Sequence, residues 1–119
     1  MSKRDPKFSL QQIVTHAQEA IDICRDRTRN DLDTDRLLNL ALTRLIEIIG
    51  EAANRVPEDV RNKYPDLPWL QMVGARNRLI HGYDSVDFDI LWAIVERDLP
   101  SVVAQLEDIL SQPDDNVYR

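Results

Sequence analysis

The sequence predicts an all-α protein, an antiparallel bundle of four main helices with one additional short helix. Apolar residues recur at helical spacing in four segments, and no segment shows the polar–apolar alternation that is typical of strands. Prolines and polar stretches separate these segments. A length of 119 residues suits one core, so we expect a single domain over 1–119, with loose ends at 1–6 and 112–119.

The first helix is expected over about 8–27. Ser9 and Gln12 have the spacing of a capping box, in which each side chain accepts a hydrogen bond from a free backbone amide at the helix start. The apolar residues that follow lie on one face of a helix: Leu10, Ile13, Val14, Ala17, Ala20, Ile21 and Cys24. This face is expected to enter the core.

The second helix is expected over 35–56, after a polar connection at 28–34. Pro57 disfavours helical geometry at Val56 and therefore ends the helix. Its apolar stripe contains Leu38, Ala41, Leu42, Leu45, Ile48, Ile49, Ala52 and Val56.

A short helix is expected at 58–63 and a third main helix at 68–81, with Pro68 as its first residue and Gly82 as its C-terminal cap. The apolar residues assigned to the third helix are Trp69, Leu70, Met72, Val73, Leu79, Ile80 and Tyr83. A fourth helix begins near Asp87, and Pro100 must kink or restart it. Its inward residues are Ile90, Leu91, Ile94, Val95, Val102, Val103, Leu106, Ile109 and Leu110.

The composition is that of a soluble globular protein, with 43% apolar and 30% charged residues. No apolar run is long enough for a membrane span, and no apolar segment follows the charged N-terminus as in a secretory signal. The single cysteine, Cys24, has no partner for a disulfide or a metal cluster. We expect a cytoplasmic protein, without membrane association, in which Cys24 is a buried, inert thiol.

The net charge of −6 argues against strong, sequence-independent binding to nucleic acid. The charge is uneven, however, because residues 36–83 hold seven bases against five acids. The middle of the chain can therefore present a positive surface, and a focused phosphate site remains compatible with the composition.

Arg76 and His81 are the most informative residues. Arg76 interrupts the predicted apolar stripe of the third helix, where a guanidinium is costly unless it is paired or faces a wet groove or interface. Histidine is the residue type whose unperturbed pKa lies nearest neutral pH. An anion-binding group and a proton-transfer group at one helix end suggest chemistry on a phosphate.

The residues alone leave several alternatives open. On a straight helix Asn77 shares a face with His81, so its amide can orient the imidazole. Arg78, three residues before His81, is an equally close neighbour of the histidine. Arg76 points about 140° away from His81 around the helix axis. His81 can instead be a favourable C-terminal cap on the helix dipole. Arg76 can be structural, paired with Glu47 or Glu51. We expect those two glutamates to contact the catalytic residues without touching the substrate, or to lie at the surface, since no second acidic motif supports a metal site.

A longer pattern surrounds these residues. The segment from Arg76 to Tyr83 reads Arg-Asn-x3-His-x-Tyr between the sequences Leu67-Pro68-Trp69 and Asp84-Ser85-Val86-Asp87. Further matching stretches are Leu45-Ile46-Glu47-Ile48-Ile49-Gly50-Glu51-Ala52-Ala53 and Asp98-Leu99-Pro100. Taken together, these motifs cover most of the chain and resemble the HepT-like branch of the HEPN superfamily.

The resemblance implies a helical bundle that forms a homodimer or a higher oligomer and cleaves RNA without a metal or another cofactor. Arg76 and His81, with Asn77, would be catalytic at the dimer interface. The family's role further implies a toxin whose antitoxin, an MNT-type nucleotidyltransferase, transfers AMP to Tyr83. The expected substrate is RNA, with tRNA as one candidate.

Two other functions remain open. The chain can be a non-catalytic nucleotide- or partner-binding subunit of a nucleotidyltransferase, in which Arg76 and His81 hold a nucleotide or dock the partner. Alternatively, Arg76 and His81 only stabilise the fold.

Overall fold

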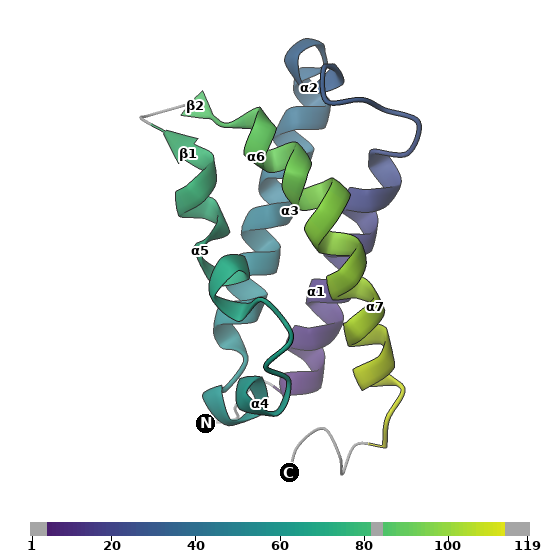
Figure 1. Cartoon of the computed structure of the whole chain (residues 1–119), viewed down its shortest axis with the longest axis vertical. Helices are drawn as coiled ribbons and strands as arrows, with labels where there is room; N and C mark the ends of the chain where they lie inside the picture. The colour runs from purple at the N-terminus through teal and green to yellow at the C-terminus, as the bar shows by residue number, and fades with distance from the viewer. Residues whose placement is uncertain (1–4, 82–84, 114–119) are drawn as a thin grey trace.

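The computed structural model describes residues 5–81 and 85–113, with Ile80 and His81 described for the backbone alone. Its elements, in chain order, are α1 (Pro6–Ile23), α2 (Asp31–Thr34), α3 (Arg36–Arg55), α4 (Glu58–Lys63), α5 (Trp69–Leu79), β1 (Ile80–His81), β2 (Ser85–Val86), α6 (Phe88–Ala93), the π-helical turn η1 (Ile94–Asp98) and α7 (Leu99–Leu110). The predicted all-α fold is confirmed, because strand structure among the described residues is confined to the small hairpin β1–β2 (Figure 1).

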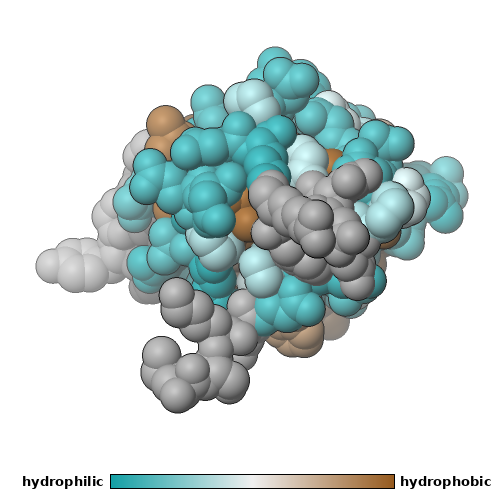
Figure 2. Space-filling view, turned by 90° about the horizontal axis from the view of Figure 1, so that it is seen from below, coloured by the Kyte–Doolittle hydropathy of each residue, from teal (hydrophilic) through white to brown (hydrophobic). Residues whose placement is uncertain are grey.

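Helix α3 packs against α1 and against α5, and α1 also packs against α7. Figure 1 shows α2 and the hairpin at one end of the bundle and α4 at the other. Seen from the α4 end, the described surface is mainly hydrophilic, with small separate apolar patches (Figure 2). Many residues of the predicted apolar stripes are fully buried, including Leu10, Ile13, Leu42, Leu91 and Leu106. The predicted stripe of the second main helix is partly wrong, because Ala41 is exposed and Ile46, which it did not include, is buried. No helix in residues 5–81 and 85–113 combines the length and apolar character needed to cross a membrane.

The start of α1 differs from the prediction. The helix begins at Pro6, where the carboxylate of Asp5 accepts a hydrogen bond from the Lys7 amide at 2.9 Å. Proline suits this position because the first helical amides have no helical acceptor. Ser9 is only 1% exposed within the helix, so the predicted capping box at Ser9 is wrong. Residues 5 and 6, assigned to a loose end, belong to the helix start.

The connection after α1 is also more structured than predicted. Helix α1 ends at Ile23 instead of near 27, and Asp26 adopts a left-handed φ of 63° that turns the chain. Helix α2 then forms within the segment assigned to a loop, with Leu32 completely buried. Asp35 caps α3 by accepting from the Leu38 amide, and this bond together with Arg27 lowers the pKa of Asp35. Helix α2 was not predicted because it is too short to give a periodic pattern in the sequence.

The thiol of Cys24 is buried, as expected. Burial raises the pKa of Cys24 to about 11, with a further increase from Glu96 and a smaller opposing effect from Arg27. Since the thiolate is the reactive form, this environment makes the cysteine inert near neutral pH.

Glycine at position 50 allows α3 and α5 to approach closely. A Cβ atom added to Gly50 would lie 2.8 Å from the backbone carbonyl oxygen of Met72, closer than real Cβ atoms come. The two helices run in opposite directions, since Gly50 lies against Met72 and Glu47 lies against Arg76. This contact fixes the position of α5 on the bundle.

Pro100 does not simply kink the last helix. It has no amide hydrogen, and in an α-helix its ring would clash with the carbonyl group four residues earlier. The chain accommodates it through η1, in which the Leu99 amide donates to the carbonyl of Ile94, five residues earlier. Helices α6 and α7 therefore follow each other through one wide turn (Figure 1).

Helix α5 is shorter than the predicted 68–81. It ends at Leu79, and Ile80 and His81 pair antiparallel with Val86 and Ser85. The Asp87 amide donates to the Leu79 carbonyl at 2.7 Å, which satisfies a free carbonyl at the helix end. The expected cap at Gly82 and the end of the C-terminal tail at 114–119 lie outside the described residues.

The two glycines on the paired helices give a matched stability test. We expect Gly50→Ala to destabilise the fold by about 1–3 kcal/mol, because the new methyl group meets a backbone carbonyl. Gly74→Ala should stabilise it by about 0.5–1 kcal/mol, because nothing lies within 4 Å of the added Cβ and alanine favours the helix. Urea unfolding measures both. A Gly50→Ala protein as stable as the wild type would contradict the close approach.

Candidate functional site

Arg76 lies in the last turn of α5 and is exposed, with 63% of its side chain accessible. Its Nε donates to Oε2 of Glu47 on α3 at 3.1 Å, and Glu47 is 24% exposed. The prediction that Arg76 lies in the core-facing stripe is therefore wrong. The expectation of a glutamate partner on the second main helix is confirmed, with Glu47 as that partner.

The buried face of α5 explains this correction. It is centred on Met72, Ala75 and Leu79, while Trp69 completes it at the helix start. At 100° per residue, Arg76 is about 70° from the centre of that face on one side, and Arg78 is about 90° from it on the other. Leu70, assigned to the core stripe, lies almost opposite and is 82% exposed. The two arginines thus flank the buried stripe of α5.

Arg76 borders a shallow groove between α3 and α5 with a volume of about 210 Å³. The residues that line it are Ile46, Glu47, Gly50, Glu51, Asn54, Val73 and Arg76. Glu51 interacts with Arg44 at 3.4 Å instead of with Arg76. Among the described residues, no group of three or more His, Cys, Asp or Glu side chains is arranged to hold a metal ion.

The ion pair with Glu47 orients Arg76 and leaves its terminal nitrogens available for other partners. Glu47 binds only Nε, and among the described residues neither terminal nitrogen of Arg76 has a hydrogen-bond partner. A guanidinium held at one edge presents its remaining donors in a planar fork, the geometry that suits phosphate oxygens. The groove can therefore bind an anion at its outer edge.

His81 lies beyond the helix, where its backbone pairs with Ser85 in the hairpin. The helical relation of His81 to Asn77 and Arg78 expected from the sequence is therefore wrong, because the chain leaves helical geometry after Leu79. The His81 side chain and all of Tyr83 lie outside the described part of the structure. Asn77 is exposed on α5.

Arg78 borders a different pocket, together with Arg97 and Asp98 of η1. From the sequence, Arg78 was a possible partner of His81 and an alternative to Arg76 for the phosphate contact, while Arg97 had no predicted role. The sequence feature that could have drawn attention to Arg97 is Pro100, since the π-helical turn that carries Arg97 and Asp98 comes directly before this proline. The pocket itself joins helices distant in the sequence, so no local pattern indicates it.

The exposure of the Arg76–Glu47 pair predicts a small effect on stability. We expect Arg76→Gln and Glu47→Gln each to change the free energy of unfolding by less than about 1 kcal/mol, because water screens exposed ion pairs. Leu79→Ala, on the same helix but fully buried, should cost about 2–5 kcal/mol. Urea unfolding of all three variants tests this. A loss above about 2 kcal/mol in Arg76→Gln would show that Arg76 is mainly structural.

Comparison with known proteins identifies the family of this chain. Residues 13–109 match the family model described as "Ribonuclease HepT-like". The chain is 40% identical over 107 residues to "Putative RNase MJ1380" of Methanocaldococcus jannaschii, covering 90% of this chain and 98% of that protein. It is 36% identical over 111 residues to "Probable ribonuclease HepT" of Thermococcus cleftensis, covering 90% and 97%.

A third relative is "Putative RNase TTE0752" of Caldanaerobacter subterraneus subsp. tengcongensis, 30% identical over 109 residues that cover 92% of this chain and 97% of that protein. No solved structure gives a significant match. The family model spans most of this chain, and the chain matches these relatives over nearly their full length. The chain therefore belongs to the HepT-like ribonuclease family.

Proposed function

We propose that this HepT-like ribonuclease is a metal-independent endoribonuclease in which Arg76 and His81 act on a scissile phosphate at a dimer interface. The observation that carries the proposal is the exposure and orientation of the Arg76 side chain. It is exposed, oriented by Glu47 through Nε alone, and located five residues before the histidine. In a family of ribonucleases, such an arginine is suited to bind the phosphate of RNA.

RNA can supply its own nucleophile for this reaction. A base removes the proton of the 2′-hydroxyl, the 2′-oxygen forms a bond to the adjacent phosphorus, and the bond from phosphorus to the 5′-oxygen breaks. The leaving 5′-oxygen takes a proton from an acid. An imidazole suits both proton transfers near neutral pH, and positioned acid–base catalysis contributes about 10²–10⁴-fold. Arg76 would stabilise the charge on the non-bridging oxygens of the phosphorane.

A second copy of the chain would supply a second histidine, so that one imidazole acts as base and the other as acid. Exposed apolar side chains support such an interface. Leu37 is 81% exposed and Leu40 is 48% exposed. Both lie near the start of α3. Because α3 runs antiparallel to α5, this start lies toward the end of α5 and the segment that leads to His81. Covering them with a partner would remove apolar surface from water next to the candidate site.

The variants Arg76→Gln and His81→Ala test the catalytic roles. Each should lower the rate of RNA cleavage at least about 100-fold while leaving the unfolding midpoint nearly unchanged, because the charge or proton transfer is lost without disturbing the core. Arg25→Gln, which removes an equally exposed ion-paired arginine from the end of α1, should cleave at the wild-type rate. Gel assays with total RNA and tRNA in the presence of EDTA measure the rates.

Three outcomes would contradict this mechanism. The first is cleavage by His81→Ala at the wild-type rate. The second is complete loss of cleavage on chelation, which would show that a metal is required. The third is a pure protein that binds nucleotide or a nucleotidyltransferase without ever cutting RNA, which would show that the binding-subunit function is correct.

We further propose that the chain is a toxin neutralised by a nucleotidyltransferase that attaches AMP to Tyr83. The position of the tyrosine supports this regulation, because it lies two residues after His81. AMP adds a bulky group with a negative charge. That group would pair with the free donors of Arg76, occupy the phosphate site and repel incoming RNA.

Intact mass after co-expression with a nucleotidyltransferase tests the modification. The mass should increase by whole AMP units, cleavage should fall in parallel, and Tyr83→Phe should remove the increase because it lacks the acceptor oxygen. Tyr64→Phe serves as the matched control and should still be modified. An unchanged mass in the wild type, or an increase that persists in Tyr83→Phe, would exclude Tyr83 as the acceptor.

A further inference from the structure

A second pocket lies on the other side of α5 from Arg76. It has a volume of about 340 Å³, in the range of small-ligand sites, and it is enclosed by α3, α5, η1 and α7. Apolar side chains form much of its lining, including Ile46 and Ile49 of α3 and Met72 of α5. A planar apolar group could rest against this surface.

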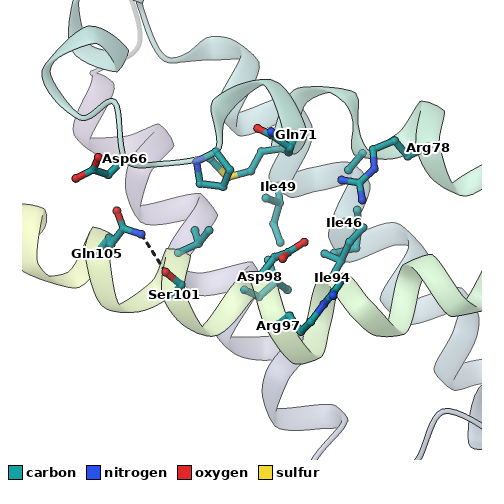
Figure 3. Close-up of a pocket in the computed structure, with 15 residues that line it drawn as sticks. Ile46, Ile49, Asp66, Gln71, Arg78, Ile94, Arg97, Asp98, Ser101 and Gln105 are labelled. Carbon is teal, nitrogen blue, oxygen red and sulfur yellow. Dashed lines mark hydrogen bonds between the residues drawn. The ribbon is translucent and has the colours of Figure 1, made fainter.

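The charged residues of the pocket are arranged unevenly. Arg78 from α5 and Arg97 from η1 lie at the same end, with Ile46 and Ile94 between them (Figure 3). Asp98 follows Arg97 along the same wall. Among the side chains of residues 5–79 and 85–113, Arg78, Arg97 and Asp98 have no ion-pair or hydrogen-bond partner.

Unpaired arginines distinguish this pocket from much of the described surface. The other described arginines include several paired with a carboxylate, such as Arg27 with Asp35 and Arg76 with Glu47. Two arginines that border one end of a pocket from separate elements, each with donors unused among the described residues, favour a bound phosphate. A carboxylate beside them can accept hydrogen bonds from the amino group of a base.

The π-helical turn builds this wall of the pocket. Pro100 cannot donate to the Glu96 carbonyl, and in an α-helix its ring would clash with that carbonyl. Directly before Pro100, the Leu99 amide bonds to Ile94, five residues earlier, so this turn is one residue wider than an α-helical turn. Arg97 and Asp98 lie within the widened turn, and π-helical turns are frequent at functional sites. The polar groups of Gln105 and Ser101, which hydrogen-bond each other at 3.0 Å, lie toward the other end of the pocket (Figure 3).

We propose that this pocket binds one nucleotide, with its phosphate at the end of the pocket that Arg78 and Arg97 border and its base against the apolar lining beside Asp98. In RNA cleavage, which is the function proposed above, this nucleotide would be a residue of the substrate flanking the scissile phosphate. Since Arg76 and Arg78 flank the buried stripe of α5, the RNA strand would cross the last turn of that helix. A free mononucleotide offers the same chemistry.

Direct binding measurements test the pocket apart from catalysis. Calorimetric titration of the full chain with each of the four nucleoside 5′-monophosphates should show saturable binding to at least one of them. Arg97→Gln and Arg78→Gln should each weaken that binding at least about tenfold through loss of a charged hydrogen bond. Ser101→Trp, an exposed position at the pocket, should block it by filling the space. Arg25→Gln should bind like the wild type.

Two results would overturn the proposal. One is unchanged mononucleotide affinity in both Arg97→Gln and Ser101→Trp. The other is inorganic phosphate binding as tightly as every mononucleotide, which would show that the base has no site.

Cleavage kinetics separate this proposal from the ribonuclease mechanism and identify the source of the nucleotide. If the nucleotide belongs to the RNA substrate, Arg97→Gln should raise KM about tenfold with little change in kcat. If the wild type never cuts RNA but loses mononucleotide binding in Arg97→Gln, the pocket proposal stands as a free-nucleotide site while the RNA mechanism fails. If the wild type cuts RNA while Arg97→Gln keeps both its KM and its mononucleotide affinity, the pocket proposal fails alone.

Discussion

The close backbone contact between α3 and α5 at Gly50 is the constraint on which both candidate sites depend. With no Cβ at Gly50, the helices approach until the Met72 carbonyl lies where a side chain would begin. At that separation Glu47 reaches Arg76 on one flank of α5. On the other flank, Ile46 and Ile49 contribute to the pocket that Arg78 borders. One glycine therefore positions an oriented guanidinium and an apolar-lined pocket on either side of the same helix.

The helices were largely predictable because their signals are local. Apolar periodicity identified the buried faces of α1, α3 and α7, and Pro57 ended α3 as expected. The start of α1 was misplaced because Asp5 and Pro6 form a stronger start than Ser9. The hairpin after α5 was missed because strands of two residues are too short to show alternation.

The candidate site was predictable in part. Arg76 and His81 were found as unusual residues near a helix end, and the family resemblance gave them roles. The orientation of Arg76 was not predictable, since it depends on how α5 rotates against α3, and a spacing of seven residues from Trp69 misleadingly placed it in the core. The pocket of Arg78 and Arg97 was not predictable either, because it is lined by residues from elements that are distant in the sequence.

The charge of the protein is compatible with this arrangement. The molecule carries a net charge of −6, so its affinity for RNA must come from a few placed cations instead of a broad basic surface. Arg76, Arg78 and Arg97 are all exposed and have unused donors among the described residues, and all three lie on or beside α5. If these arginines bind RNA as proposed, so few phosphate contacts would give only a small sequence-independent contribution to affinity.

The chemistry of the cleaved RNA ends tests the central mechanism most directly. Attack by the 2′-hydroxyl, assisted by His81 and Arg76, leaves a 2′,3′-cyclic phosphate on one product and a 5′-hydroxyl on the other. Mass spectrometry of a short RNA cut by the pure protein should detect these ends. Products that carry a 3′-hydroxyl and a 5′-phosphate would show that water was the nucleophile and would contradict the account.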